Sequence, residues 1–277
     1  MKVAFNILPV ITAYEQVHLL IELGNYGICF AWFTRDPYDV SGIAVYNLGE
    51  DSHSTDMAAE IENVLRSAPI FSKQYASVTV CYDFKESLLV PAAYHSEATA
   101  QSMLELMYAS DAEDHCKSEP VEKENCFVVY TVYQEVEKTL LRHFPSANSR
   151  HATSLQLDKL NRNGKILHCI FFHNSIKIFL FDNEALQIVQ QFRYSLPVDA
   201  SYQLLNCCER YDIRPSDLTL VLSGMIEEKS KLYAELYKYF LNIEFAKPDE
   251  QISLHDRIKF YPPHFFSHIT GLASCVS

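Results

Sequence analysis

One of two histidine pairs has a spacing that could bind a metal ion. His264 and His268 are four residues apart in a segment expected to be helical, where they would share a face and could bind one metal ion. No third ligand lies at a suitable spacing, so packing and surface roles are the favoured interpretation and no metal is expected. His168 and His173 are an odd number of residues apart in an expected strand, so their side chains should point to opposite faces.

Adjacent cysteines raise the possibility of a nucleophile. Cys207 and Cys208 fall in an expected helix, with Cys208 on the apolar stripe formed by Leu204 and Tyr211. A reactive thiol needs a neighbouring base or a helix N-terminus, and the sequence offers neither. The chain has eight cysteines and no C-x-x-C pair. We therefore expect reduced thiols, no structural metal and a cytoplasmic protein. The sequence also contains no G-x-S-x-G elbow, P-loop or G-x-G-x-x-G segment.

Composition limits the classes of partner. The chain has 277 residues, a net charge of −12 and a sequence pI of about 5.3. This charge disfavours nucleic acids and anionic membranes as partners. No apolar run is long enough to span a bilayer, and the first residues do not suggest a secretory leader. There are only 7 glycines, which matters because loops that bind phosphate are usually built from glycine.

The elements that must position these residues are clearest in the second half. Three apolar runs with short polar connections predict an antiparallel meander. A helix, a strand, a helix and a further strand should follow, with a last helix near 263–272. The predicted strands are Ile166–His173, Ile176–Phe181, Leu186–Tyr194, Leu218–Leu222 and Ile243–Ala246.

The first half shows the same order of elements. A meander is expected at Val17–Leu23, Gly27–Phe33 and Gly42–Leu48, followed by a helix over 51–68 capped by Ser52 or Ser54. Later elements are strands at Ser77–Tyr82, Leu88–Ala92 and Cys126–Thr131, a helix opened by Ser96, and helices at Val132–Phe144 and Ala152–Asn161. The acidic segment 111–125 is interpreted as a solvated loop, with a partner-binding segment as the alternative, and 145–150 as a break between elements.

The repeated order predicts an α/β chain with two domains, residues 1–148 and 149–277. It resembles the actin-like ATPase fold of actin, the Hsp70 ATPase domain and sugar kinases. It is most similar to a family of uncharacterised bacterial proteins assigned that fold. Stretches such as IELGNYGICFAW and LTLVLSGMIEEKSKLYAEL carry the resemblance. The resemblance implies a duplicated RNase H-like β-β-β-α-β-α-β-α unit, with two domains around a cleft that holds nucleotide.

The resemblance also implies where nucleotide would bind. In this fold the first hairpin of each half carries Asp-Xaa-Gly, which holds phosphate and hydrated Mg²⁺. Here Glu22 would replace the Asp and Gly24 matches the Gly, followed by Asn25. The second hairpin offers Asn174 and Ser175, with no carboxylate and no glycine.

Gly224 keeps one glycine of the pair that contacts adenosine in this fold. The glycine-containing loops of both halves also have a simpler interpretation. Glu22 would lie at a strand end in water beside a tight hairpin, and Gly224 would serve a strand-to-helix turn.

Glu22 and Asp83 could form a carboxylate pair, because the first and fourth strands are neighbours in this fold. Such a pair could contribute to a two-metal nuclease, which needs several converging carboxylates, or Asp83 could orient water in an ATPase. The simpler alternative is two solvent-exposed carboxylates at strand ends.

We expect a non-catalytic protein-interaction, scaffold or regulatory module whose partner is another protein and which has no cofactor. The runner-up is an ATPase or phosphotransferase that binds ATP with magnesium. A third hypothesis is a module that binds a peptide or small ligand between the domains. The aromatic run Phe260–Phe266 would be a partner site if exposed, whereas Tyr233, Tyr237 and Tyr239 are expected to pack on a sheet.

Overall fold

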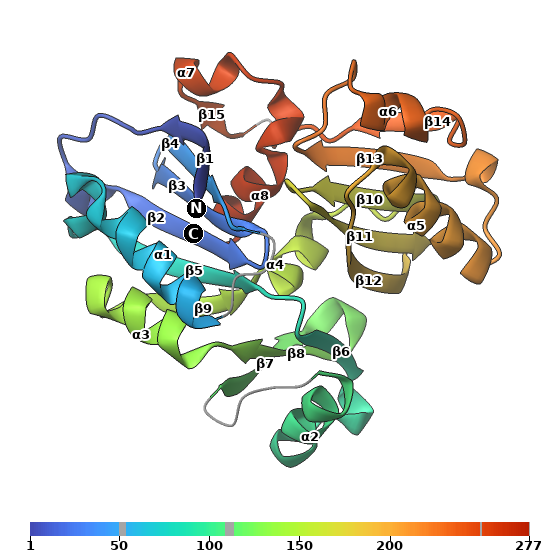
Figure 1. Ribbon diagram of the computed structural model, residues 1–277, viewed down its shortest axis with the longest axis horizontal. Helices are drawn as coiled ribbons and strands as arrows, with labels where there is room; N and C mark the ends of the chain where they lie inside the picture. Colours follow the sequence, from blue (N-terminus) through green and yellow to red (C-terminus); the bar gives the residue numbers. More distant parts are fainter. Residues whose placement is uncertain (50–53, 109–113, 250, 277) are drawn as a thin grey trace. The chain divides into compact units, whose positions relative to one another are not determined.

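A computed structural model describes residues 1–49, 54–108, 114–249 and 251–276, and the chain divides into two compact units (Figure 1). Unit 1 comprises Met1–Asp158, Gln251–Ile258 and Leu272–Ser277; unit 2 comprises Lys159–Glu250 and Lys259–Gly271. The boundary predicted at 148/149 falls at the start of β9 (Asn148–His151), a strand of unit 1.

The main sheet of unit 1 contains the predicted meander. Strands β2 (His18–Gly24), β3 (Gly27–Arg35) and β4 (Tyr38–Asn47) are antiparallel neighbours, and β5 (Ser77–Asp83) runs parallel to β2. The short strand β15 (Ser253–Leu254) pairs with β4. Helices α1 (Ser54–Arg66) and α3 (Gln134–His143) pack against each other. Of the two expected caps of α1, Ser52 lies outside the described residues.

The sheet also contains a strand that the sequence analysis did not predict. β1 (Lys2–Ile7) forms the edge of the sheet and pairs antiparallel with β4. Its sequence, KVAFNI, is too short for a strand periodicity to stand out. Among the described residues, no helix is both long and apolar enough to cross a bilayer.

A second, three-stranded sheet is inserted into unit 1 between β5 and α3. Its order is β6 (Ser87–Pro91), β8 (Cys126–Val132) and β7 (His115–Val121), and α2 (Glu97–Met107) packs on it. Cys126–Thr131 was expected to belong to the order of elements that both halves share, and this is wrong, because as β8 it lies in the inserted sheet. β9 pairs with β5 in the main sheet instead. Residues 145–150, interpreted as a break, contain the start of β9, whose polar sequence NSRH gives no strand signal.

The prediction of a solvated loop at 111–125 is also wrong for residues 115–121, which form β7. Residues 111–113 lie outside the described residues. Glu119 of β7 is buried, and its carboxylate pairs with Arg150. It also accepts the backbone N–H of His151 at 2.7 Å and the hydroxyl of Ser154 at 2.8 Å. A polar segment can thus form a strand because the one carboxylate that the strand buries is paired.

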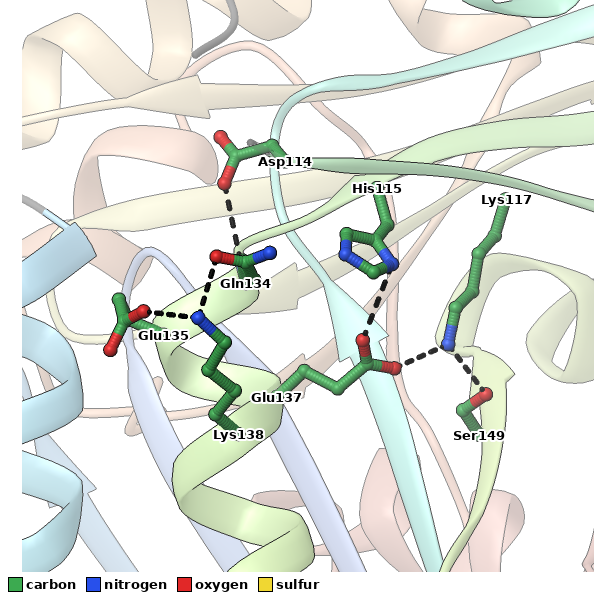
Figure 2. A network of polar contacts seen from close by, with 8 residues as sticks. All are labelled: Asp114, His115, Lys117, Gln134, Glu135, Glu137, Lys138 and Ser149. Carbon is green, nitrogen blue, oxygen red and sulfur yellow. Dashed lines mark hydrogen bonds and ion pairs between the residues drawn. The ribbon is translucent and has the colours of Figure 1, made fainter. Parts of the chain in front are cut away.

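Figure 2 shows a second polar network that joins β7 to α3 and β9. Lys117 Nζ lies 2.6 Å from Glu137 Oε1 and donates to Ser149 Oγ at 3.2 Å. His115 Nδ1 is 3.7 Å from the same carboxylate. Asp114 accepts the backbone N–H of Gln134 at 3.2 Å, at the start of α3. These contacts connect the inserted sheet to the main body of unit 1.

Unit 2 has the predicted order. The sheet order is β12-β11-β10-β13-β14, and α5 and α6 cover one face of it. The core contains apolar residues from β10, β11, β13 and both helices. The bounds are β10 Lys165–Phe171, β11 Ser175–Asp182, β12 Ala185–Arg193, α5 Pro197–Arg210, β13 Thr219–Gly224, α6 Lys231–Leu236 and β14 Asn242–Phe245.

The described residues contain three further α-helices. α4 (Ala152–Lys159) was predicted, whereas the four-residue α7 (Asp256–Lys259) was not. The last helix, expected near 263–272, is a 3₁₀ turn at Pro263–Phe265 followed by α8 (Ser267–Cys275).

Candidate functional site

The candidate site is the end of the β2–β3 hairpin in unit 1 together with the end of β5. The parallel pairing of β2 with β5 places Glu22 opposite Cys81 and Gly24 opposite Asp83. On its other side Glu22 lies opposite Cys29 of β3. The two predicted carboxylates therefore lie on neighbouring strands.

Both carboxylates are buried. Glu22 is 0% exposed and Asp83 is 2% exposed. The simpler alternative, two strand-end carboxylates in water, is therefore wrong. Burial, and then the negative charge of Glu22, raise the pKa of the Cys29 and Cys81 thiols well above the ordinary value. These thiols stay protonated and act as small apolar neighbours of Glu22.

Tyr26 joins the two carboxylates. Its ring is 7% exposed and its hydroxyl donates a hydrogen bond to Asp83 Oδ2 at 3.1 Å. Burial, then the charge of Asp83, then that of Glu22 raise the pKa of the Tyr26 phenol well above its ordinary value. The phenol therefore remains a hydrogen-bond donor at neutral pH, which lets two acidic side chains be buried close together.

Sequence reasoning did not identify Tyr26 as part of this site. The available signal was an aromatic residue two positions after Gly24 in a tight hairpin. A tyrosine there can fold back over the glycine.

Gly24 is required by this arrangement. A Cβ at this position would lie 2.5 Å from Tyr26 Cε1 and 2.6 Å from the Asp83 carbonyl oxygen. The space beside the Gly24 backbone is thus filled by the protein itself. Asn25, next in the hairpin, accepts the backbone N–H of Lys85 through its side-chain oxygen at 2.8 Å. It therefore fixes the segment that follows β5.

The hairpin of unit 2 is held by its own contacts. Phe172 N–H donates to the Ser175 carbonyl at 2.8 Å, and Tyr194 N–H donates to the Asn174 carbonyl at 3.0 Å. The Ser175 hydroxyl is buried and accepts from Gln191 Nε2 at 3.3 Å. Both predicted residues thus contribute to the pairing of β11 and β12.

Gly224 ends β13 with a positive φ of 78°. A Cβ there would collide with the Phe171 carbonyl oxygen of β10, which also accepts the N–H of Met225 at 2.7 Å. A tight turn against β10 fully accounts for this glycine.

Three of the four histidines in the two pairs serve packing, whereas His173 is exposed in the turn between β10 and β11 and so lies outside the strand in which it was predicted. His264 is buried, donates from Nε2 to the Ile226 carbonyl at 2.7 Å and stacks on Phe245 with ring centroids 4.1 Å apart. Burial lowers the pKa of His264. His268 lies in α8 and contacts Phe172 edge-on, so the two histidines do not share one helix. His168 donates to the Asn161 carbonyl at 2.7 Å.

Over the described residues, no three His, Cys, Asp or Glu side chains are grouped as metal ligands would be. Cys207 and Cys208 are both buried in α5, and burial raises their pKa values to about 11 and about 12. Neither thiol has the low pKa that a nucleophile requires.

The aromatic run Phe260–Phe266 is mixed in exposure. Phe260 is highly exposed, whereas Phe265 and Phe266 are buried. Tyr237 and Tyr239 are exposed and Phe240 is buried, so the expectation that these tyrosines pack on a sheet is wrong for Tyr237 and Tyr239.

The family described as "Protein of unknown function (DUF3822)" matches residues 10–243. The chain belongs to this family. No curated protein matches the chain significantly.

Two solved structures show the fold. One is a Bacteroides thetaiotaomicron VPI-5482 protein described as having an actin-like ATPase fold and unknown function. It has 17% sequence identity and a TM-score of 0.75, and the match covers 94% of this chain and 96% of that chain. The other is the PilM–PilN type IV pilus biogenesis complex, with 13% identity and a TM-score of 0.65, covering 94% of this chain and 98% of that chain. The predicted actin-like ATPase fold is confirmed.

The residues present do not fit the magnesium–nucleotide site that this fold implies. A carboxylate that holds hydrated Mg²⁺ must reach water, whereas Glu22 is fully buried. The Tyr26 ring fills the space beside Gly24, and the Phe171 backbone closes against Gly224. The second hairpin provides neither a carboxylate nor a glycine.

Proposed function

We propose that this protein is a non-catalytic member of the actin-like ATPase fold that acts through contacts with another protein in the cytoplasm. The observation that carries the proposal is the Glu22–Tyr26–Asp83 cluster. In this cluster Tyr26 donates to Asp83, and Glu22 lies buried close enough for its charge to raise the Tyr26 pKa, so both carboxylates that would serve Mg²⁺ and phosphate lie beneath the protein surface. A protein with this fold but without working phosphate loops can still present surfaces to a partner.

One solved relative supports a role in protein contacts. The PilM–PilN structure is a complex of a protein of similar fold with a second protein. For the present chain the corresponding idea is a scaffold or regulatory subunit whose partner contacts do not depend on nucleotide.

The alternative is an ATPase or phosphotransferase that uses Glu22 and Asp83. The observation in its favour is that β2 and β5 bring these two carboxylates to one place. In that case the cluster would have to open, so that Asp83 could orient water and Glu22 could reach Mg²⁺.

Phosphate release from Mg-ATP separates the two proposals. We expect the wild-type protein to release phosphate no faster than a matched Asp83→Asn variant. A turnover rate that is clearly above background in the wild type and lost in Asp83→Asn would overturn the non-catalytic proposal. Asn keeps the size of the side chain and one acceptor oxygen, so the variant should keep the bond from Tyr26 and remain folded.

A further inference from the structure

Helix α2 covers one face of the inserted sheet, and the main body of unit 1 lies on the other (Figure 1). Ala100 and Leu104 of α2 form a small apolar core with the sheet, against which Cys116 of β7 packs. The next side chains that point the opposite way, Lys117 and Glu119, bond to β9. Successive side chains of a strand point to opposite faces. The outer side of α2 therefore faces away from the main sheet of unit 1.

This outer side carries two adjacent stripes of exposed side chains. Residues four apart on a helix follow one another along one side. Glu97, Gln101 and Glu105 form the first stripe, and Gln101 Nε2 donates to Glu105 Oε1 at 2.8 Å. The second stripe begins with small side chains at 98 and 102 and ends with Leu106, which is 84% exposed. A line of carboxylates thus runs beside a line that ends in a large apolar side chain.

Large apolar side chains are also exposed at both ends of α2. Tyr94 precedes the helix and is 70% exposed, and Met107 ends it and is 61% exposed. Exposed apolar side chains rimmed by polar residues are typical of protein interaction surfaces.

The charge of the chain selects the kind of partner. Unit 1 contains 11 Lys or Arg and 23 Asp or Glu, whereas unit 2 contains 12 of each, so unit 1 carries the whole net charge of −12. The segment 86–116, which contains α2, has six acidic residues and no Lys or Arg. These charges disfavour nucleic acid, an anionic membrane or the same acidic surface of a second copy. They favour a cationic partner, because unlike charges steer the encounter and suppress wrong partners.

We propose that the outer face of α2 binds a basic amphipathic helix of another protein. Both stripes run along the axis of α2, so a second helix that packs alongside it contacts both. Its Lys or Arg side chains pair with Glu97 and Glu105, and its apolar side chains cover Leu106. This partner rests on the proposed function, because a protein that acts through contacts with another protein needs such a surface.

The test uses a fluorescein-labelled amphipathic peptide of about four helical turns, with Leu on one face and Lys on the other. Fluorescence anisotropy measures its Kd for the full chain. The double variant Glu97→Gln with Glu105→Gln should raise the Kd about tenfold, and Leu106→Ser should do the same. Binding should weaken as the salt concentration rises, because the ion pairs are exposed. Circular dichroism checks that every variant is folded.

Matched controls lie in unit 2. Glu209→Gln changes an exposed carboxylate of α5, and Leu241→Ser changes an apolar side chain that is 71% exposed. Both should bind the peptide as the wild type does, and a peptide with Glu in place of Lys should not bind. The proposal is overturned if the wild type does not bind the basic peptide, if the α2 variants bind it unchanged, or if the controls lose binding equally. Phosphate release from Mg-ATP tests the non-catalytic proposal separately, so either idea can fail without the other.

Discussion

Replacing Tyr26 by Phe should destabilise unit 1 without changing its fold. The ring that fills the space beside Gly24 would remain, but the hydroxyl that donates to Asp83 would be lost. Asp83 is 2% exposed, so water does not readily replace the donor. A buried charged acceptor that loses one hydrogen-bond donor costs about 2 kcal/mol of unfolding free energy. The nearby charge of Glu22, one cause of the raised Tyr26 pKa, would add repulsion.

Urea unfolding followed by the fluorescence of Trp32 measures this effect. Trp32 is the single tryptophan, is fully buried in β3 of unit 1, and donates from Nε1 to the Tyr75 hydroxyl at 2.9 Å. The midpoint should fall while the slope with urea stays constant. The matched control is Tyr202→Phe, which removes the hydroxyl of a side chain that is 64% exposed and should change stability by less than about 0.5 kcal/mol. Equal stability of Tyr26→Phe and the wild type would refute the stabilising role of the Tyr26–Asp83 hydrogen bond.

Tyr26→Phe also tests the direction of the Tyr26 pKa shift. The folded protein raises the pKa of Tyr26 above the ordinary 10.0, so the unfolded chain loses this proton first as pH rises. The stability that Tyr26 contributes is therefore complete below pH 10.0 and falls above it. The stability difference between wild type and Tyr26→Phe should shrink from pH 9 to pH 11, two values that bracket the ordinary tyrosine pKa of about 10. A difference that grows over this range would contradict the assignment.

Three further predictions follow from single sites. Gly224→Ala should lower the free energy of unfolding by about 1–3 kcal/mol, because the new Cβ would collide with the Phe171 carbonyl oxygen at a position with positive φ. Thermal unfolding measures this loss, and an unchanged midpoint would show that the turn can relax. Glu119→Gln should cost about 1–3 kcal/mol and speed amide exchange at the start of α4, and unaltered exchange there would count against the network. Cys207 and Cys208, with pKa values of about 11 and about 12, should resist iodoacetamide in the native protein at neutral pH and react in urea; rapid native labelling would disagree with their burial.

Elements with a clear hydrophobic periodicity could be predicted from the sequence. Both meanders and the helices α3 and α5 were recognised because hydrophobic periodicity dominates their sequences. The inserted sheet was not recognised as a separate sheet. β8 has the apolar sequence of a central strand, and nothing local indicates which sheet it joins. β9 has the sequence NSRH, and its pairing with β5 is a tertiary effect.

The candidate site was predicted only in part. The resemblance to a fold in which the first and fourth strands are neighbours was sufficient to predict that Glu22 and Asp83 lie on adjacent strands. Their burial was not predictable, because it depends on Tyr26 folding back over Gly24 and on the thiols of Cys29 and Cys81 beside Glu22. A carboxylate in a strand is predicted to face solvent unless neighbouring side chains are known to bury it.

Thermal unfolding with and without millimolar Mg-ATP is the most direct test of the central claim, that the phosphate loops of this fold no longer work here. A ligand that binds only the native state at 100 times its Kd adds about 2.7 kcal/mol, which raises the midpoint by several degrees. We expect no rise with Mg-ATP beyond that with Mg²⁺ alone, in the wild type and in Glu22→Gln alike. A rise of several degrees in the wild type that Glu22→Gln abolishes would contradict the account and establish a nucleotide site at this hairpin.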